Sequence, residues 1–155
     1  MNRHILGIVG GTFQSKVDYT VQTIPFSIAA FDLNQDTNLD LAVANQGPDT
    51  VSILLGDGNG SFVVEVTPYP VSTDPQSVIF LHANNDDTID LAVACTGASV
   101  VSILLGVAVL FSPRVDYPTG VVPWMVVAAD FNQDTNMDLA VANEGTNTIS
   151  VLFGT

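Results

Sequence analysis

The sequence predicts an all-β fold made of repeated four-stranded units, the pattern of β-propeller blades. One stretch occurs three times, first as "FDLNQDTNLDLAVANQGPDTVSILLG" from Phe31 and again from Leu81 and Ala129. Short apolar runs alternate with Asn, Asp, Gly and Pro throughout, as in chains of short strands and turns. No window shows the 3.6-residue apolar period of a helix. The repeat period of about 50 residues is typical of propellers and solenoids.

Each unit is predicted to contain four short strands. "SIAAF" (27–31) is the first, and "DLAVAN" (40–45) is the second, apolar enough to be buried on both faces. "TVSILLG" (50–56) is the third. "FVVEVTPY" (62–69) alternates apolar and polar residues, which predicts a half-exposed strand at the edge of the sheet.

We interpret the chain as a single repeat domain, residues 1–155. The predicted units span approximately 13–61, 62–110 and 111–155, with 1–12 as the tail of a repeat unit. The reason is that "ILGIVGGTF" at 5–13 matches "LLGDGNGSF" at 54–62 in register. The apolar N-terminal stretch is therefore interpreted as repeat sequence and not as a signal peptide.

The charge balance favours a cation as ligand. The chain has 3 Lys and Arg against 16 Asp and Glu, a formal net charge of -13. We therefore expect neither nucleic acid nor an anionic membrane as partner, because both need basic patches. No apolar run reaches the length of about 18 residues that spans a membrane. The single Cys95 excludes an intramolecular disulfide and a Cys-based zinc site, and we expect it to be a small buried side chain.

The first and third copies each contain the pattern D-x-N-x-D-x-N-x-D. Oxygen-bearing side chains at every second position converge when such a loop curls, and Ca²⁺ prefers six to eight oxygen ligands. We expect side-chain oxygens from positions 1, 3, 5 and 9 and a backbone carbonyl from position 7. The alternative is an Asx-rich turn whose side chains bond their own backbone. The candidate ligands are Asp32, Asn34, Asp36, Asn38 and Asp40, then Asp130, Asn132, Asp134, Asn136 and Asp138.

The middle copy carries the weakest of the three predicted sites, so two or three Ca²⁺ ions are expected per chain. His82 stands where the other copies have the first Asp. The remaining candidate ligands there are Asn84, Asp86, Thr88 and Asp90. All three windows lack glycine at position 6, where they have Thr37, Asp87 and Thr135. A left-handed backbone at that position would cost roughly 1 kcal/mol, which predicts weak affinity.

These motifs resemble a known repeat family. "DLNQDTNLDLAVAN" followed by "VSILLGDGNGSF" is similar to the FG-GAP/VCBS repeat of integrin α-chain propellers, and the resemblance covers nearly the whole chain. It implies four-stranded blades with calcium between the first and second strands. It also implies an extracellular protein that acts in adhesion or ligand binding.

Three units are too few for a closed propeller, which has four to eight blades. Either the chain is a fragment of a larger propeller, or two copies close a six-bladed ring. The register permits the second, because Phe13 to Tyr19 is predicted to be a fourth strand and 149–154 a third strand. Both would leave exposed strand edges, so we expect a homo-oligomer and not a stable monomer.

The predicted function is a calcium-binding scaffold for adhesion or binding, with calcium mainly structural and the protein or glycan ligand unknown. The alternative is a calcium-dependent lectin. Its candidate contacts are Phe26, Gln76 and Trp124, because the residue after the repeated proline changes within an otherwise constant unit. We expect no enzyme, since the chain has neither a nucleophile elbow nor a phosphate-binding glycine loop.

Overall fold

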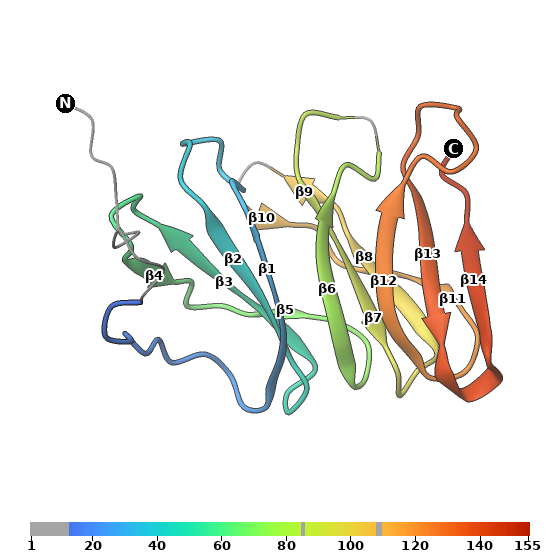
Figure 1. The fold of residues 1–155 in the computed structure, drawn as a ribbon, viewed down its shortest axis with the longest axis horizontal. Helices are drawn as coiled ribbons and strands as arrows, with labels where there is room; N and C mark the ends of the chain where they lie inside the picture. The colour runs from blue at the N-terminus through green and yellow to red at the C-terminus, as the bar shows by residue number, and fades with distance from the viewer. Residues whose placement is uncertain (1–12, 85, 108–109) are drawn as a thin grey trace.

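The chain folds into three antiparallel sheets, and the computed structural model describes residues 13–84, 86–107 and 110–155 (Figure 1). The first sheet contains β1 (Pro25–Phe31), β2 (Asp40–Asn45), β3 (Thr50–Gly56), β4 (Phe62–Val64) and β5 (Tyr69–Pro70). The second contains β6 (Pro75–Leu81), β7 (Asp90–Cys95), β8 (Val100–Leu104) and β11 (Val115–Pro118). The third contains β12 (Pro123–Ala129), β13 (Asp138–Asn143) and β14 (Thr148–Leu152). A small hairpin pairs β9 (Gly106–Val107) with β10 (Leu110–Phe111).

The all-β prediction is confirmed. Within the described residues the one helical element is the short 3₁₀ turn η1 (Glu144–Thr146). Strands follow one another in space in the order β1-β2-β3-β4, β6-β7-β8-β11 and β12-β13-β14. None of the helical structure in the described part of the chain is long and apolar enough to cross a membrane.

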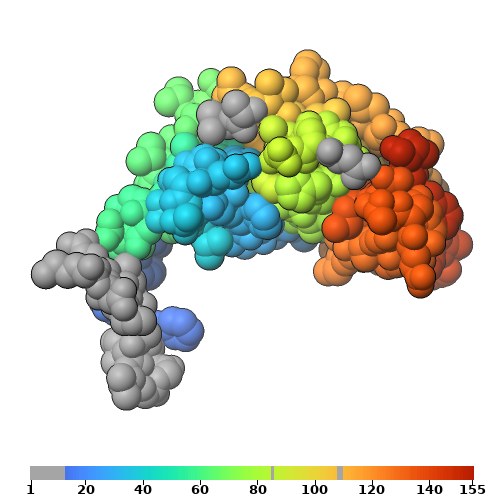
Figure 2. Space-filling view, turned by 90° about the horizontal axis from the view of Figure 1, so that it is seen from above, coloured from blue at the N-terminus to red at the C-terminus, as the bar shows by residue number. Residues whose placement is uncertain are grey.

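The three sheets stand side by side along an arc, with β1, β6 and β12 as neighbours (Figure 2). Two hydrophobic cores form between successive sheets. The first core includes Val51 and Ile53 from the first sheet, with Leu91 and Val93 from the second. The second core joins the other face of the second sheet to the third. Every residue of β7 is buried, as the apolar "DLAVA" pattern predicts for a strand covered on both faces.

The predicted strands differ from the structure of the single chain in two places. Residues 13–19, predicted to be a fourth strand, form no strand in the single chain; they lie beside the first sheet as irregular chain. The predicted strand 62–69 is split into β4 and β5, which pair with opposite ends of β3. Pro68, which cannot donate to the ladder, lies in the gap between them. The predicted repeat tail, residues 1–12, lies outside the described residues.

Candidate functional site

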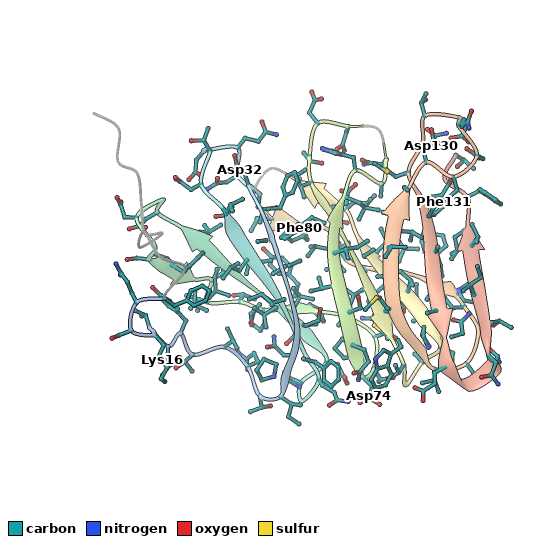
Figure 3. All side chains as sticks on the ribbon, viewed as in Figure 1. Lys16, Asp32, Asp74, Phe80, Asp130 and Phe131 are labelled. Atoms are coloured by element: carbon teal, nitrogen blue, oxygen red, sulfur yellow. The ribbon has the colours of Figure 1, made fainter. Side chains whose placement is uncertain are left out.

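The three acidic windows are the loops that join the first and second strands of each sheet. All three lie at the same end of the sheets, where Asp32 and Asp130 are labelled (Figure 3). They connect β1 to β2, β6 to β7 and β12 to β13. The fold therefore places chemically similar loops next to one another on one rim of the molecule.

The first loop curls so that its alternating side chains converge. Asp32 accepts the backbone N–H of Asp36 at 3.0 Å and that of Thr37 at 2.8 Å. The Oδ1 atom of Asn34 accepts the same Asp36 N–H at 3.1 Å. Two side-chain oxygens from positions 1 and 3 thus accept from one backbone N–H group, which is the contact that the Asx-turn alternative predicts.

Asp36 continues the pattern from position 5. Its Oδ1 accepts the backbone N–H of Asn38 at 2.8 Å, and Oδ2 accepts the Nδ2–H of Asn34 at 3.1 Å. The N–H of Asn38, more than the amide of Asn34, lowers the pKa of this exposed carboxyl below its ordinary value. Asp36 therefore keeps its negative charge to lower pH than an isolated aspartate.

The third loop reproduces these contacts position by position. Asp134 N–H donates to Asp130 at 3.1 Å and to Asn132 at 3.0 Å, and Thr135 N–H donates to Asp130 at 2.9 Å. Asn136 N–H donates to Asp134 at 2.8 Å and lowers the pKa of that carboxyl. The recurrence shows that the D-x-N-x-D-x-N pattern specifies one loop geometry.

The last Asp of each window has a role that the sequence reasoning missed. Asp40 is fully buried, and its two oxygens accept the backbone N–H groups of Leu33 at 2.9 Å and Gly56 at 2.8 Å. Asp90 and Asp138 make the corresponding pairs, with Ala83 and Gly106 and with Phe131 and Gly154. Each carboxylate therefore joins the loop to the end of the third strand.

A glycine recurs at the end of the third strand, and this glycine was the sequence signal for the hydrogen bonds of the buried carboxylate. These paired bonds from one carboxylate to the loop and to the strand end are called the brace. A Cβ atom on Gly56 would lie 2.2 Å from the carbonyl oxygen of Leu39, and one on Gly106 would lie 2.3 Å from that of Ile89. Only glycine allows the strand end to approach the loop so closely. "LLG" in two copies and "LFG" in the third mark the point where the buried carboxylate binds.

The backbone of the first and third loops is strained at position 6. Thr37 has φ 73° and Thr135 has φ 75°, which confirms the left-handed conformation considered for this position. A β-branched residue is a true outlier there. Asp87, at the same position of the middle loop, is not among the described residues with positive φ.

The middle loop is built differently around His82. The Nδ1–H of His82 donates to the carbonyl of Thr88 at 2.9 Å, so the position-7 carbonyl predicted to bind metal is engaged by the ring. Asp86 accepts both the hydroxyl and the N–H of Thr88, which lower its pKa in that order. His82 thus removes one carboxylate and occupies one carbonyl oxygen.

The donor chemistry of the first and third loops fits a hard cation. Asp32, Asn34 and Asp36 carry the side-chain oxygens that Ca²⁺ prefers, although the Nδ2–H of Asn34 donates to Asp36. The same oxygens also satisfy backbone N–H groups, so the Asx-turn alternative describes real contacts of these loops. In the part of the chain that the structure describes, no three His, Cys, Asp or Glu side chains cluster closely enough to hold a metal.

Comparison with known families identifies part of the chain. The model of the FG-GAP-like repeat matches residues 32–93, from the first residue of the first loop into β7. Residues 32–93 are therefore similar to the FG-GAP-like repeat. A search of curated proteins finds no match. The FG-GAP-like repeat therefore includes the whole of the first and middle loops, and the third loop repeats the same sequence pattern outside the matched range.

The three candidate contacts for a bound ligand, Phe26, Gln76 and Trp124, lie at the end of the sheets opposite the acidic loops, because each follows the proline that begins β1, β6 or β12. The rings of Phe26 and Trp124 meet edge to face with centroids 5.9 Å apart, and both rings are about half exposed. Gln76 is buried, and its Oε1 has no hydrogen-bond partner among the described residues. The structure thus brings together an aromatic pair from the first and third sheets. Gln76 lies at the equivalent position of β6, the strand that neighbours both β1 and β12.

Proposed function

We propose that this chain is a binding scaffold of the propeller type whose first and third acidic loops each take up one Ca²⁺ ion as a structural ion. The FG-GAP-like repeat and the all-β fold indicate the scaffold. The calcium assignment is supported by two loops with the same hydrogen bonds, in which the oxygens of positions 1 and 3 meet at one point.

In this proposal Asp32, Asn34 and Asp36 hold the ion of the first loop, and Asp130, Asn132 and Asp134 hold that of the third. The ion supplies positive charge where carboxylates repel one another in a chain of net charge -13. The protein's contribution is a curl already formed by its own backbone N–H groups. The middle loop takes up no ion, because His82 replaces a carboxylate and occupies the Thr88 carbonyl.

Calcium titration of the chelator-treated protein by calorimetry and native mass spectrometry tests the assignment. We expect two ions per chain, one after Asp36→Asn, and none after Asp36→Asn with Asp134→Asn. Asp57→Asn is the matched control, because Asp57 is also exposed and accepts the N–H groups of Asn59 and Ser61, but outside the acidic windows. Uptake of no calcium, or the same loss in the Asp57 control, would contradict the proposal.

The physiological role proposed for the scaffold is adhesion or ligand binding outside the cell. FG-GAP repeats typically occur in extracellular proteins, and weak calcium sites are filled at extracellular calcium concentrations. Calcium in this role holds the rim loops in shape, so that they can present a surface. The matching test is binding to immobilised ligands in calcium and in chelator, with the loss reversed by added calcium.

A calcium-dependent lectin is a second candidate, favoured by the half-exposed aromatic pair of Phe26 and Trp124 and by Gln76 on the strand between them, whose Oε1 has no partner in the described part of the chain. Aromatic rings stack on apolar sugar faces, and a carboxamide supplies hydrogen bonds to hydroxyls. Glycan-array binding that is lost in Trp124→Ala but retained in Phe131→Ala supports it. Phe131 is a half-exposed aromatic residue at the opposite end of the sheets (Figure 3). Equal binding by both variants contradicts it.

A further inference from the structure

The third sheet has a free edge where the other two have an outer strand. β3 pairs with β4 and β5, and β8 pairs with β11, but within the described residues β14 pairs only with β13. Ile149 on β14 is 72% exposed, whereas its counterpart Val101 on β8 is fully buried. An exposed apolar edge of this kind is a template for another strand.

A segment of the same chain has the sequence of the missing strand. Residues 17–19 read Val-Asp-Tyr, identical to residues 115–117 of β11. β11 pairs with β8 so that Asp116 lies opposite Ser102, and Ser102 donates its hydroxyl hydrogen to Asp116 at 2.6 Å. In the repeat, Ser150 of β14 stands where Ser102 stands, since each lies opposite the central valine of its "DLAVA" strand.

The register of β11 on β8, applied to β14, gives a partner for each of residues 17–19. It sets Val17 opposite Val151, Asp18 opposite Ser150, and Tyr19 opposite Ile149. Asp18 then accepts the hydroxyl hydrogen of Ser150 as Asp116 accepts that of Ser102. The pairing therefore gains a polar contact at its centre.

A cavity beside β14 lies where the repeat register places a phenylalanine that recurs in this chain, at Phe13, Phe62 and Phe111. It has a volume of about 240 Å³ and is lined by residues that include Leu105, Tyr117, Leu139 and Leu152. Between the first and second sheets the counterparts of these four residues are Leu55, Tyr69, Leu91 and Leu104, and they belong to the core cluster that contains Phe111. The ring of Phe111 packs edge to face on that of Tyr69, with centroids 5.1 Å apart. The cavity is the corresponding space without a phenylalanine.

Phe13 is the residue that the repeat register assigns to this cavity. It lies six positions before Tyr19, as Phe111 lies six positions before Tyr117. Phe13 is 98% exposed in the single chain, the highest value among the large apolar side chains of the described residues. Burial of a phenylalanine is strongly favourable, so an exposed ring and a matching apolar cavity are complementary.

The segment cannot reach its own third sheet while it stays at the first. Residues 13–20 lie beside the first sheet, and β14 lies at the other end of the arc (Figures 1 and 2). Tyr19 packs on Phe62 with ring centroids 5.5 Å apart, the same kind of contact as Tyr69 on Phe111. The segment therefore already lies where the outer strand of a preceding sheet would lie, and a second copy supplies that sheet.

The faces of the two end sheets are complementary in the same way. Ile28 of β1 is 63% exposed, but its counterparts Val78 and Val126 are buried against the preceding sheet. Val151 of β14 is also exposed, but its counterpart Ile53 is buried against the following sheet. The residues exposed on the two end sheets are therefore equivalent to residues that are buried between sheets within the same chain.

We propose that two copies of this chain exchange residues 13–20, each segment adding a fourth strand to β14 of the partner copy and placing Phe13 in the cavity beside Tyr117. Two reciprocal contacts of this kind close a ring of six sheets, within the four to eight blades of known propellers. Head-to-tail contacts form such a ring when the rotation closes. The occupant is a second copy and not an unrelated strand, because register, cavity and sheet face all match the same chain.

The first test mixes two variants that each add one cysteine to the buried Cys95, Val17→Cys and Val151→Cys, both at exposed positions where folding tolerates change. Opposed residues of paired strands lie within disulfide range, so oxidation of the mixture is expected to give a covalent heterodimer on a non-reducing gel. Either variant alone is expected to remain uncrosslinked. Asp18→Cys mixed with Val151→Cys is the control, since adjacent residues point to opposite faces. A mixture without heterodimer, or equal crosslinking in the control, overturns the register.

The second test measures the dimer by native mass spectrometry and sedimentation. The unmodified chain is expected to be a dimer, and Phe13→Ala is expected to raise its dissociation constant at least about a hundredfold. Val66→Ala, which truncates a similarly exposed side chain in the gap between β4 and β5, is expected to change nothing. A chain that stays monomeric at all concentrations overturns the proposal and assigns the free edge to another polypeptide segment. A dimer insensitive to Phe13→Ala also overturns it.

Discussion

Replacement of Asp40 separates the two roles that a buried loop carboxylate can have, closing a metal site or bracing the fold. Asp40→Ala removes the acceptor of two backbone N–H groups, those of Leu33 and Gly56, at a fully buried position. A buried donor left without a partner costs about 1–3 kcal/mol. The two donors together predict a loss of about 2–6 kcal/mol in the free energy of unfolding, a large part of an ordinary domain's 5–15 kcal/mol.

The assay is urea unfolding at one fixed protein concentration, in chelator and again in calcium, analysed by linear extrapolation. We expect nearly the whole loss to be present in chelator, because the brace needs no metal. Asp40→Asn is expected to lose less, since its amide oxygen still accepts one of the two N–H groups. Asp57→Ala, at an exposed turn, is expected to stay within about 0.5 kcal/mol. A loss that appears only in calcium would refute the brace and return Asp40 to the role of a closing ligand.

Two further predictions concern the strained loops and the cysteine. Thr37→Gly is expected to stabilise the fold by about 1 kcal/mol, because glycine adopts the left-handed backbone without the strain of a β-branched residue. Asp87→Gly, at the unstrained position of the middle loop, is expected to destabilise the fold. Equal effects of the two substitutions in thermal melts would contradict the strain at Thr37. Burial raises the pKa of the Cys95 thiol to about 11 from 9.0, so a thiol reagent at pH 8 is expected to label it only as the protein unfolds. The folded chain keeps a proton that the unfolded chain loses, so stability falls between about pH 9 and 11; rapid labelling without denaturant would argue against burial.

The repeat explains why so much of the fold could be predicted from the sequence. "DLAVAN" and "TVSILLG" form strands with the predicted bounds, because their apolar pattern is local and recurs in each sheet. Burial of Cys95 was predicted for the same reason, since its position lies on the central strand of its unit. The strand predicted at 13–19 is absent from the single chain because a strand needs a partner, and the partner predicted for it is the third strand, 149–154, of a second copy.

The acidic loops were also predicted only in part, in their local contacts and not in their contacts with distant residues. Alternation of Asp and Asn determined that side-chain oxygens converge, since curling a loop with this spacing brings positions 1 and 3 to the same backbone N–H. The sequence could not show that Asp40 is buried against Gly56, because that contact joins a loop to a strand end sixteen residues later. From the sequence, His82 was only a replacement for the first aspartate. Its hydrogen bond to the Thr88 carbonyl depends on how the folded loop places the ring.

The sequence by itself determined the all-β fold class, the repeat, the first three strands of each sheet and the curl of the acidic loops, because these depend on patterns within a few residues. Only the tertiary structure decided which faces of each sheet are buried and which strand edges are paired. The repeated units are nearly equivalent in sequence, yet Val101 is buried and Ile149 is exposed. The physical reason is position along the arc, since an inner sheet is covered on both sides and an end sheet on one. The same cause leaves the edge of β14, the cavity beside Tyr117 and the ring of Phe13 exposed in the single chain.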